Sequence, residues 1–519
     1  MKQKFTLLLL LSMLVGTLVN GQTKKIIEPN VGFLNNLIMG DTAADGTRLS
    51  DIYVLRRDAD YLLSAQIENH GWKLHIEAEA GNGKLPHIVP FPDESVTIPS
   101  RMFRLYGEGE FKNLFIDGRP QDVTLPTSAQ LIRSDFEGQK LDIEGCVFAN
   151  AGQAGVQVWK ANEYVKVNNC QFINMGIMSQ ADFGNGRVFD CRDSDIGLFS
   201  LTNCTFVNVI DRIIRHRGGS GVMRNVIVDH NTMINQAAYH GFIEIGNVGP
   251  SVKITNNLMI DCMGLGGDQS DATRLSELDG HGEKDGNGSP IMVWIGSIPN
   301  DSTTYEISHN VYSVSDKLKT FYTAQGYDEG PILTEHIKGK INNAATAFIK
   351  KDITLGNHPE AMTEFYNWYV DPAGNDKQKV TTSAVDYDVK SYNYWVSDLD
   401  CSYTTEDTDF MGSDDEKVGD NNWAPSTGIS SYKASAVKLS AYPNPVTDHF
   451  TLSFELEKAS NVSIDIFDIT GKLMRSINAG TYDEGENSMT IQRDGLNSGM
   501  YLLKLNGGTN SSHKKIIVE

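Results

Sequence analysis

The segment LDIEGCVFANA at 141–151 is followed by two close copies, VKVNNCQFINM at 165–175 and FSLTNCTFVNV at 199–209. Each copy has a short alternating strand, a polar turn and a second short strand. Three further copies begin at positions 226, 252 and 305, so successive copies start 24, 34, 27, 26 and 53 residues apart. Repeats of this length built from short strands are typical of a parallel β-helix, in which each coil lies on the one before it.

Stacking the copies places equivalent residues in columns, with about 4.8 Å from coil to coil. One column holds cysteine and asparagine, a second holds aromatic residues and methionine, and a third holds asparagine and aspartate. Their members are Cys146, Cys170, Cys204, Asn231, Asn257 and Asn310; Phe148, Phe172, Phe206, Met233, Met259 and Tyr312; and Asn150, Asn174, Asn208, Asn235 and Asp261. We expect the asparagines to form buried turn ladders rather than to bind ligands. The cysteines are expected to be packed thiols, and a disulfide between neighbouring coils stays open.

Length and charge limit the classes of function. The chain has 519 residues, 40% of them hydrophobic, and 45 Lys+Arg against 66 Asp+Glu give a net charge of −21. Such a chain can bury a large core, and nucleic acid is excluded as the expected partner because phosphate binding needs a basic face. An acidic polysaccharide needs only a local basic groove. Six cysteines are too few for a disulfide scaffold. We also expect the protein to be a monomer.

Residues 1–21 have the pattern of a secretory signal peptide. Lys2 and Lys4 precede the apolar run FTLLLLLSMLVGTLV at 5–19, and small or polar residues follow it. An uncleaved anchor is the alternative. The sequence therefore predicts export.

The last part of the chain predicts a small antiparallel β-sandwich, because alternating strands are separated by turn residues. YPNPV at 442–446, IFDITGKL at 466–473, LNSGMYLLKL at 496–505 and KKIIVE at 514–519 closely resemble the C-terminal sorting domain of type IX secretion cargo. The resemblance implies the type IX machinery as a partner, passage across the outer membrane, and then release or attachment at the cell surface.

The predicted fold is therefore all-β, a right-handed parallel β-helix followed by a small β-sandwich. The predicted domains are a signal peptide at 1–21, the β-helix with end caps at 22–411, a linker at 412–438 and the sorting domain at 439–519.

The strand before each repeat segment gives an outer face that could carry chemistry, because side chains fill the interior of a β-helix. Residues alternate along a strand between inside and outside. If Phe189, Ile214, Ile243 and Val293 point inward, their neighbours point outward. The outward set is Trp159, Lys160, Asp190, Arg192, Arg215, Arg217, Glu244 and Trp294, with Tyr239 and His240 just before the Glu244 strand. His216 is expected to point inward unless its strand bulges.

This outward set predicts an elongated groove for an acidic polysaccharide. Arginine presents a planar fork that matches carboxylate or sulfate, and tryptophan faces suit sugar rings. The predicted substrate-binding residues are Trp159, Lys160, Tyr239, His240, Glu244 and Trp294. The alternative is a salt-bridge ladder, with Arg215 between Asp190 and Glu244, that serves only the stability of the fold.

The stretch IIRHRGGSGVMRNVIVDHNTMIN at 213–235 resembles the surroundings of the catalytic arginine in polysaccharide lyase family six, which includes chondroitinase B and alginate lyases. Members of that family are right-handed β-helices. The resemblance implies β-elimination in a uronic-acid polysaccharide, with the catalytic residues among Arg192, Arg215, His216 and Arg217. The stretch FDCRDSD at 189–195 takes the place of the family's base lysine, so Arg192 or no residue fills that role.

The lyase reaction sets chemical requirements. A cation or arginine must neutralise the uronate carboxylate before a base removes the C5 proton and the glycosidic oxygen leaves. Arg215 and Arg217 could neutralise the carboxylate, and we expect Arg215 to be essential. The base could be Arg192, His216, His240 or Tyr239. Use of calcium is left open; a Ca²⁺ ion would bind Asp190 and Glu244.

Two other functions stay open. A β-helix glycoside hydrolase would need two carboxylates, and the sequence Gly280-His281-Gly282 matches a motif of polygalacturonases, although it lies in a long loop. A surface protein that binds glycans or mediates adhesion would keep the Trp/Arg groove but need no base.

Overall fold

The computed structural model describes residues 22–92, 97–120, 127–176, 185–279, 283–296, 302–370, 399–423, 440–456, 459–468, 473–507 and 510–519. The signal peptide predicted at 1–21, the sequence Gly280–Gly282 and the second half of the predicted linker lie outside these residues. The chain forms two compact units, Met1–Ala424 and Pro425–Glu519. Within the described residues, no helix is both long and apolar enough to cross a membrane.

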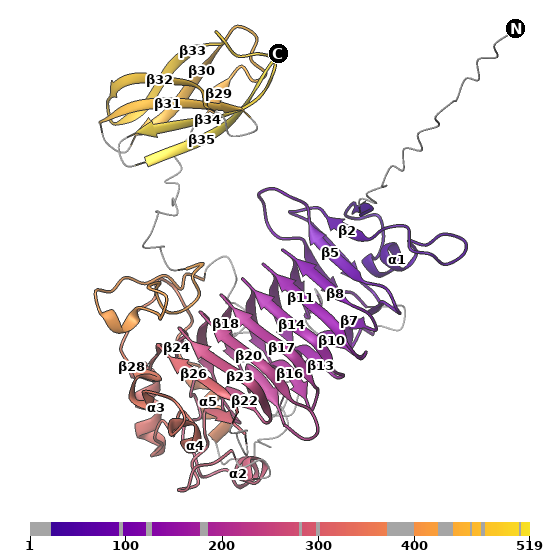
Figure 1. Ribbon diagram of the computed structural model, residues 1–519, viewed down its shortest axis with the longest axis vertical. Coiled ribbons are helices and arrows are strands. Elements are labelled where there is room, and N and C mark those ends of the chain that lie inside the picture. Colours follow the sequence, from indigo (N-terminus) through magenta and orange to yellow (C-terminus); the bar gives the residue numbers. More distant parts are fainter. Residues whose placement is uncertain are drawn as a thin grey trace, which may run out of the picture. The chain divides into compact units, whose positions relative to one another are not determined.

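The first unit is a right-handed parallel β-helix in which each coil adds one strand to each of three parallel sheets (Figure 1). Sheet I consists of β1 (Lys24–Ile27), β2 (Ile52–Leu55), β5 (Leu74–Ala78), β8 (Gly109–Lys112), β11 (Gln139–Glu144), β14 (Asn162–Asn168), β17 (Ile196–Thr202), β20 (Met223–Asp229), β23 (Val248–Thr255) and β26 (Thr304–Ser308). Sheet II consists of β3 (Asp60–Leu63), β6 (His87–Pro90), β9 (Phe115–Asp117), β12 (Val147–Ala151), β15 (Gln171–Met175), β18 (Thr205–Val209), β21 (Thr232–Gln236), β24 (Leu258–Ile260), β27 (Asn310–Ser313) and β28 (Phe348–Lys350). Sheet III consists of β4 (Ile67–Glu68), β7 (Arg101–Leu105), β10 (Gln130–Ser134), β13 (Ala154–Val158), β16 (Arg187–Arg192), β19 (Ile214–His216), β22 (Ile243–Ile245) and β25 (Val293–Ile295).

The repeat read from the sequence corresponds to a strand of sheet I, a turn and a strand of sheet II. Phe172 pairs with Phe148 on one side and with Phe206 on the other. The ring centroids of these neighbours are 4.8 and 5.4 Å apart, and the rings lie within 8° of parallel. The predicted β-helix and its aromatic column are therefore confirmed.

The third column is a buried asparagine ladder, as expected. The side-chain amide of Asn174 donates to Oδ1 of Asn150 over 3.3 Å. That of Asn208 donates to Oδ1 of Asn174 over 3.0 Å. Each of these three asparagines has φ between 56° and 60°, in the left-handed region. Asparagine tolerates this region better than most other residues with a side chain. This explains why asparagine recurs at the same position in successive coils.

The first column contains packed thiols rather than a disulfide. Cys146, Cys170 and Cys204 are buried and unbridged. The Cys204 thiol lies 3.1 Å from the carbonyl oxygen of Thr202, and burial raises the pKa of the Cys170 thiol well above its usual value. The column continues as amides, with the backbone N–H of Asn231 donating to the Asn257 side chain over 3.0 Å.

Helices cover both ends of the hydrophobic core. At the N-terminal end, α1 (Leu34–Met39) buries Leu34 and Ile38. At the C-terminal end, α3 (Asp316–Gln325) and α5 (Thr363–Val370) bury aromatic residues in the same core. The remaining helical segments are α2 (Ala272–Asp279), α4 (Glu335–Lys338), η1 (Ala344–Thr346) and η3 (Thr408–Phe410).

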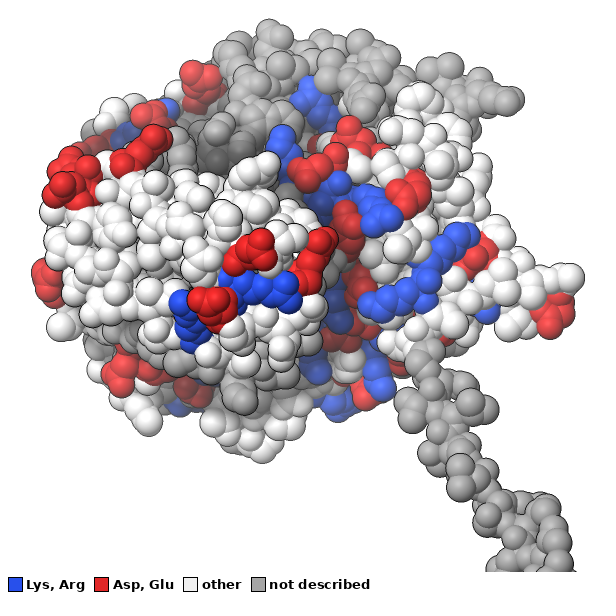
Figure 2. Space-filling model, turned by 90° about the horizontal axis from the view of Figure 1, so that it is seen from above, with Lys and Arg blue, Asp and Glu red and all other residues white. Residues whose placement is uncertain are grey.

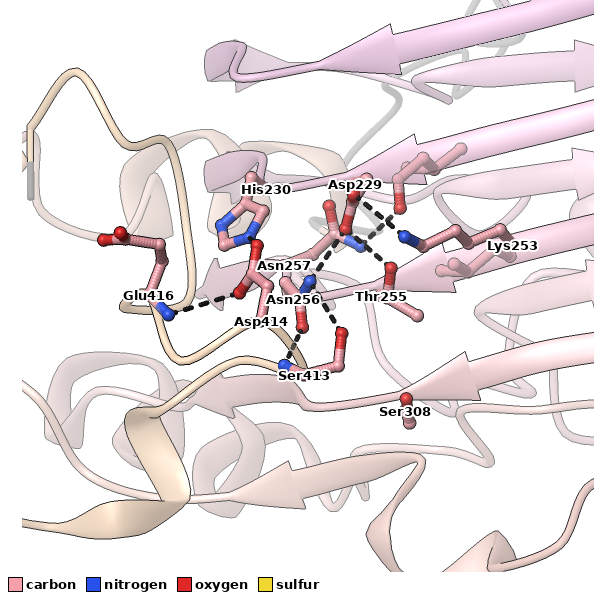
Figure 3. A network of polar contacts seen from close by, with 12 residues as sticks. Asp229, His230, Lys253, Thr255, Asn256, Asn257, Ser308, Ser413, Asp414 and Glu416 are labelled. Atoms are coloured by element: carbon pink, nitrogen blue, oxygen red, sulfur yellow. Dashed lines mark hydrogen bonds and ion pairs between the residues drawn. The ribbon is translucent and has the colours of Figure 1, made fainter.

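Residues 399–423 form a strap over the outer face of sheet II. That face is apolar, and Val418 of the strap is buried in the same cluster as Val207 and Ile234. Asp414 of the strap lies 2.9 Å from the imidazole of His230, and the backbone N–H of Ser413 donates to Asn256 over 2.9 Å (Figure 3). The first residues of the predicted linker, 412–423, therefore pack against this sheet face.

The second unit is an antiparallel β-sandwich. One sheet contains β29 (Ser440–Tyr442), β30 (His449–Leu456) and β33 (Gly485–Gln492). The other contains β32 (Leu473–Tyr482), β31 (Ser460–Asp468), β34 (Gly499–Gly507) and β35 (Asn510–Val518). Apolar residues of both sheets, including Phe450 and Ile464, form one shared core.

Candidate functional site

Sheet III has the register expected from the sequence. Phe189 pairs with Ile214, and Ile214 pairs with Ile243, which pairs with Val293; all four residues are buried in the core. The adjacent column on the outer face of the sheet is Asp190, Arg215, Glu244 and Trp294.

This column is not open to solvent. The exposed fractions of Asp190, Arg215, Glu244 and Trp294 are 1%, 3%, 1% and 4%. The long connection between β24 and β25 contributes to this burial, since its Glu283 is fully buried and lies 3.7 Å from the guanidinium of Arg212. The groove expected over these residues is therefore filled, and Trp294 has no open face for a sugar.

The buried charges are paired with one another. We call this set the charge cluster: Arg187, Asp190, Asp211, Arg212, Arg215, Glu244 and Glu283. Arg215 Nη1 lies 2.9 Å from Asp190 Oδ1, and Gln157 donates to Asp190 Oδ2 over 2.9 Å. Arg212 contacts Glu244, and its Nε lies 3.2 Å from Asp211 Oδ2. A charge without a partner would be costly at this depth.

Asp190 and Arg215 hold each other in their charged forms. Burial alone would raise the pKa of Asp190, but the charges of Arg187 and Arg215 lower it to about 2. Burial and the neighbouring arginines lower the pKa of Arg215 to about 9, so the guanidinium stays protonated at neutral pH. Arg215 therefore acts as a cation here and not as a base.

The candidate bases lie inside the protein. His216 is fully buried, as expected for an inward residue, and its Nε2 lies 3.0 Å from the carbonyl oxygen of Ser194. Burial lowers the pKa of His216, so the ring is neutral at pH 7. His240 is 6% exposed with its Nδ1 2.8 Å from Asp211, and Tyr239 is fully buried. None of these three side chains reaches an open surface.

The residues proposed for calcium, Asp190 and Glu244, both belong to the charge cluster. Asp190 and Glu244 lie on strands separated by β19, so they are two coils, or about 10 Å, apart along the column. Ca²⁺ binds oxygen ligands at about 2.3–2.6 Å. Each carboxylate faces a guanidinium. No group of three or more His, Cys, Asp or Glu side chains suited to a metal occurs among the described residues.

An open pocket lies beside the charge cluster, where sheet III turns toward sheet I. Its volume is about 460 Å³, and it is lined by Glu137, Trp159, Lys160, Ala161, Arg192, Asp193, Ser194, Asp195, Ser220 and Gly221. We call it the Trp159 pocket. It contains three of the residues predicted from the sequence, Trp159, Lys160 and Arg192.

Arg192 reaches the pocket because its strand bulges. The register of β16 and β19 shifts between Asp190 and Arg192, and Arg192 has φ of 49°. The bulge turns the side chain outward at the strand end, where it is 35% exposed. Its guanidinium lies 4.7 Å from the ring centroid of Trp159, which is 40% exposed. Arg217 is exposed but does not line the pocket.

The pocket carries both signs of charge. Lys160 Nζ lies 3.9 Å from Glu137, and Asp193 accepts a hydrogen bond from the backbone N–H of Gly219 over 3.0 Å. Basic and acidic side chains are also interspersed on the face drawn in Figure 2. The pocket therefore offers hydrogen-bond acceptors for hydroxyl groups as well as two cations.

Several members of this site were not predicted. Arg133, whose guanidinium lies 4.2 Å from the Trp159 ring centroid, occupies an outward position one coil earlier. Asp211 and Arg212 precede strand β19, and Glu283 comes from the long connection. Alternation along the strand could have indicated Arg133, but no local pattern indicates the other three.

Residues 440–519 match the family described as secretion system C-terminal sorting domain. No curated protein matches the chain. The family match agrees with the antiparallel sandwich and confirms the expected partner, the type IX secretion machinery. The chain is therefore a parallel β-helix protein with a type IX sorting domain, exported and then secreted or attached to the cell surface.

Proposed function

We propose that this exported protein binds an acidic polysaccharide in the Trp159 pocket. The observation that carries the proposal is the combination of a half-exposed tryptophan, two cations and several oxygen acceptors around about 460 Å³ of open space. This volume is in the range of small-molecule sites, and the mostly polar lining around one aromatic residue suits a ligand with many hydroxyl groups.

Two cations of the pocket can contact an anionic group of a sugar, although Glu137, Asp193 and Asp195 also line it. Arg192 Nε lies 3.4 Å from Asp190, and its side chain is exposed enough to offer its other N–H groups to a carboxylate or sulfate. Lys160 is 48% exposed beside it. The Trp159 ring already contacts Arg133 and Arg192, so a sugar would meet the exposed part of the ring together with Arg192 rather than a bare ring face.

Cleavage of that polysaccharide by β-elimination is the second candidate function. The observation that favours it is that the pocket brings two cations, Arg192 and Lys160, to one place where a uronate carboxylate could be neutralised. Of the four residues assigned to catalysis by resemblance, Arg192 alone lines the pocket, while Arg215 and His216 are buried. Elimination would require a base at the C5 proton of the bound sugar.

The test uses the exported chain and a panel of polygalacturonate, alginate, chondroitin sulfate and neutral dextran. Binding is measured by affinity electrophoresis for the wild type and for Trp159→Ala and Tyr164→Ala. Tyr164 is a matched control because it is also an aromatic residue beside a cation, but it lies on sheet I and does not line the pocket. The Lys166 ammonium lies 4.1 Å from the centroid of the Tyr164 ring. We expect retardation by an acidic polymer that Trp159→Ala loses and Tyr164→Ala keeps. Retardation unchanged in Trp159→Ala, or absent with every polymer, would reject the proposal.

The same mixtures separate binding from cleavage. Ultraviolet absorbance of an unsaturated uronide that rises together with reducing ends would establish elimination. Reducing ends without absorbance would indicate hydrolysis, and binding without either would leave a glycan-binding protein.

A further inference from the structure

One residue per coil continues the surface of the Trp159 pocket toward the N-terminal end of sheet III. Glu68 pairs with Arg104, so His70 is level with Tyr106. Leu105 pairs with Ser134, and Ser134 pairs with Val158. Residues at or just beyond the ends of these strands are therefore aligned, in the order His70, Tyr106, Asp135, Trp159 and Arg192.

These residues and two arginines are in continuous contact. The rings of His70 and Tyr106 stack with centroids 4.4 Å apart, and the Arg104 guanidinium lies 4.9 Å from the Tyr106 centroid. Arg104 Nε and Arg133 Nε lie 2.5 and 2.8 Å from the two oxygens of Asp135. Arg133 in turn lies 4.2 Å from the Trp159 centroid. We call this row the arginine–aromatic ladder: His70, Tyr106, Arg104, Asp135, Arg133, Trp159 and Arg192.

The ladder is partly open and has an excess of positive charge. The His70 side chain is 62% exposed and that of Arg104 is 29% exposed, whereas Asp135 is 5% exposed and is held between two arginines. Arg101 lies on the same strand as Arg104, and burial together with the charges of Arg133 and Arg104 lowers its pKa. Glu68 lies 2.8 Å from His70 and 3.9 Å from Arg104, so carboxylates as well as arginines line this row.

We propose that the ladder is a row of further sugar subsites, so that an acidic polysaccharide lies along the β-helix axis from the Trp159 pocket toward His70. This inference rests on the proposed function. Four steps of one coil each span about 19 Å, which is enough for several linked sugar rings. The partly exposed aromatic residues Tyr106 and Trp159 lie two coils apart and could contact sugar rings at their exposed edges, and the arginines beside them suit carboxylates.

The test measures affinity as a function of chain length. Oligogalacturonates and oligoalginates of defined length, from dimer to octamer, are titrated calorimetrically into the full chain and into Tyr106→Ala, His70→Ala, Trp159→Ala and the control Tyr164→Ala. We expect Tyr106→Ala to weaken octamer binding about fivefold, which corresponds to the loss of one aromatic contact. Dimer binding should be unchanged in Tyr106→Ala and weakened in Trp159→Ala. His70→Ala, at an exposed position that should not affect folding, should weaken the octamer alone.

Two negative results have different meanings. If Tyr106→Ala and His70→Ala bind every length as Tyr164→Ala does while Trp159→Ala weakens the dimer, the ladder is not a binding surface and the pocket stands. If Trp159→Ala also binds every length like the wild type, the proposed function itself is overturned.

Discussion

The guanidinium of Arg215 lies 2.9 Å from the carboxylate of Asp190, and the two side chains are 4% and 1% exposed. They occupy neighbouring coils of sheet III, with Glu244 on the coil beyond. In this arrangement the pair stabilises the stacked coils. A direct role for Arg215 in catalysis would require the protein to open above it, whereas Arg192 already lies at an open surface.

Removal of Arg215 should destabilise the fold. Arg215→Ala leaves Asp190 buried without its nearest cation, and we expect a loss of about 3–5 kcal/mol in the free energy of unfolding. Urea unfolding of the full chain measures it. The matched control is Arg224→Ala, whose ion pair with Asp195 is exposed and should contribute less than about 1 kcal/mol. Equal free energies of unfolding for the two variants would show that the buried ion pair stabilises the fold no more than the exposed one.

Acid should weaken the charge cluster. Because the pKa of Asp190 falls from 3.8 to about 2 on folding, the ionised carboxylate stabilises the folded state above about pH 4. This contribution is lost as the pH falls toward 2. The urea midpoint of the wild type should therefore decrease more steeply between about pH 5 and pH 2.5 than that of Asp190→Asn. Parallel curves for the two proteins would contradict the assigned shift.

The strap should respond to pH in the opposite sense. Burial raises the pKa of Asp420 from 3.8 to about 6, although Thr205 and Asn422 donate hydrogen bonds to its carboxylate. The folded state then holds the proton more tightly, so stability is lost as the pH rises from about 4 to above 6, by up to about 3 kcal/mol. The nearby Asp414 behaves differently, because its contact with His230 lowers the pKa of its carboxyl group. Its contribution to the stability of the folded state is therefore lost only in acid.

The measurement for the strap is the thermal unfolding of the wild type and Asp420→Asn at about pH 4.5 and about pH 8. We expect the variant to gain stability relative to the wild type at the higher pH, because the amide carries no charge to desolvate. A difference between the two proteins that does not change with pH would show that Asp420 does not titrate in this range.

The asparagine ladder should depend on backbone conformation as well as on hydrogen bonds. Asn208 has φ of 56° and donates to Asn174. Asn208→Ala loses the hydrogen bonds and strains the backbone, and Asn208→Gly loses only the bonds. We expect Asn208→Ala to be less stable than Asn208→Gly by about 1–2 kcal/mol, in chemical unfolding. A glycine variant as unstable as the alanine variant would show that the side-chain bonds dominate.

The register of the outer face could be predicted from the sequence because two regular patterns determine it. The coil repeat aligns the strands, and alternation along each strand separates Asp190 from Phe189 and Arg215 from Ile214. Burial of that face could not be predicted in the same way. It depends on Glu283 in a long connection, and no repeat or alternation specifies where such a connection lies.

The packing of residues 412–423 could not be predicted for a related reason. Residues 412–423 are small and polar, as linkers are, yet the apolar outer face of sheet II requires a cover. Val418 and Trp423 contribute to this cover, and composition does not reveal that role. The pocket residues Trp159 and Arg192 were predicted as outward residues, but the bulge that turns Arg192 toward Trp159 has no sequence signal of its own.

The central claim is that an acidic polysaccharide occupies the Trp159 pocket. Hydrogen–deuterium exchange of the full chain, with and without the polymer that retards it in electrophoresis, maps the contact directly. The account predicts slower exchange in peptides covering 157–161 and 192–195, and unchanged exchange on the strands of sheet I around Tyr164. Protection confined to other parts of the chain, with none around Trp159 and Arg192, would contradict it.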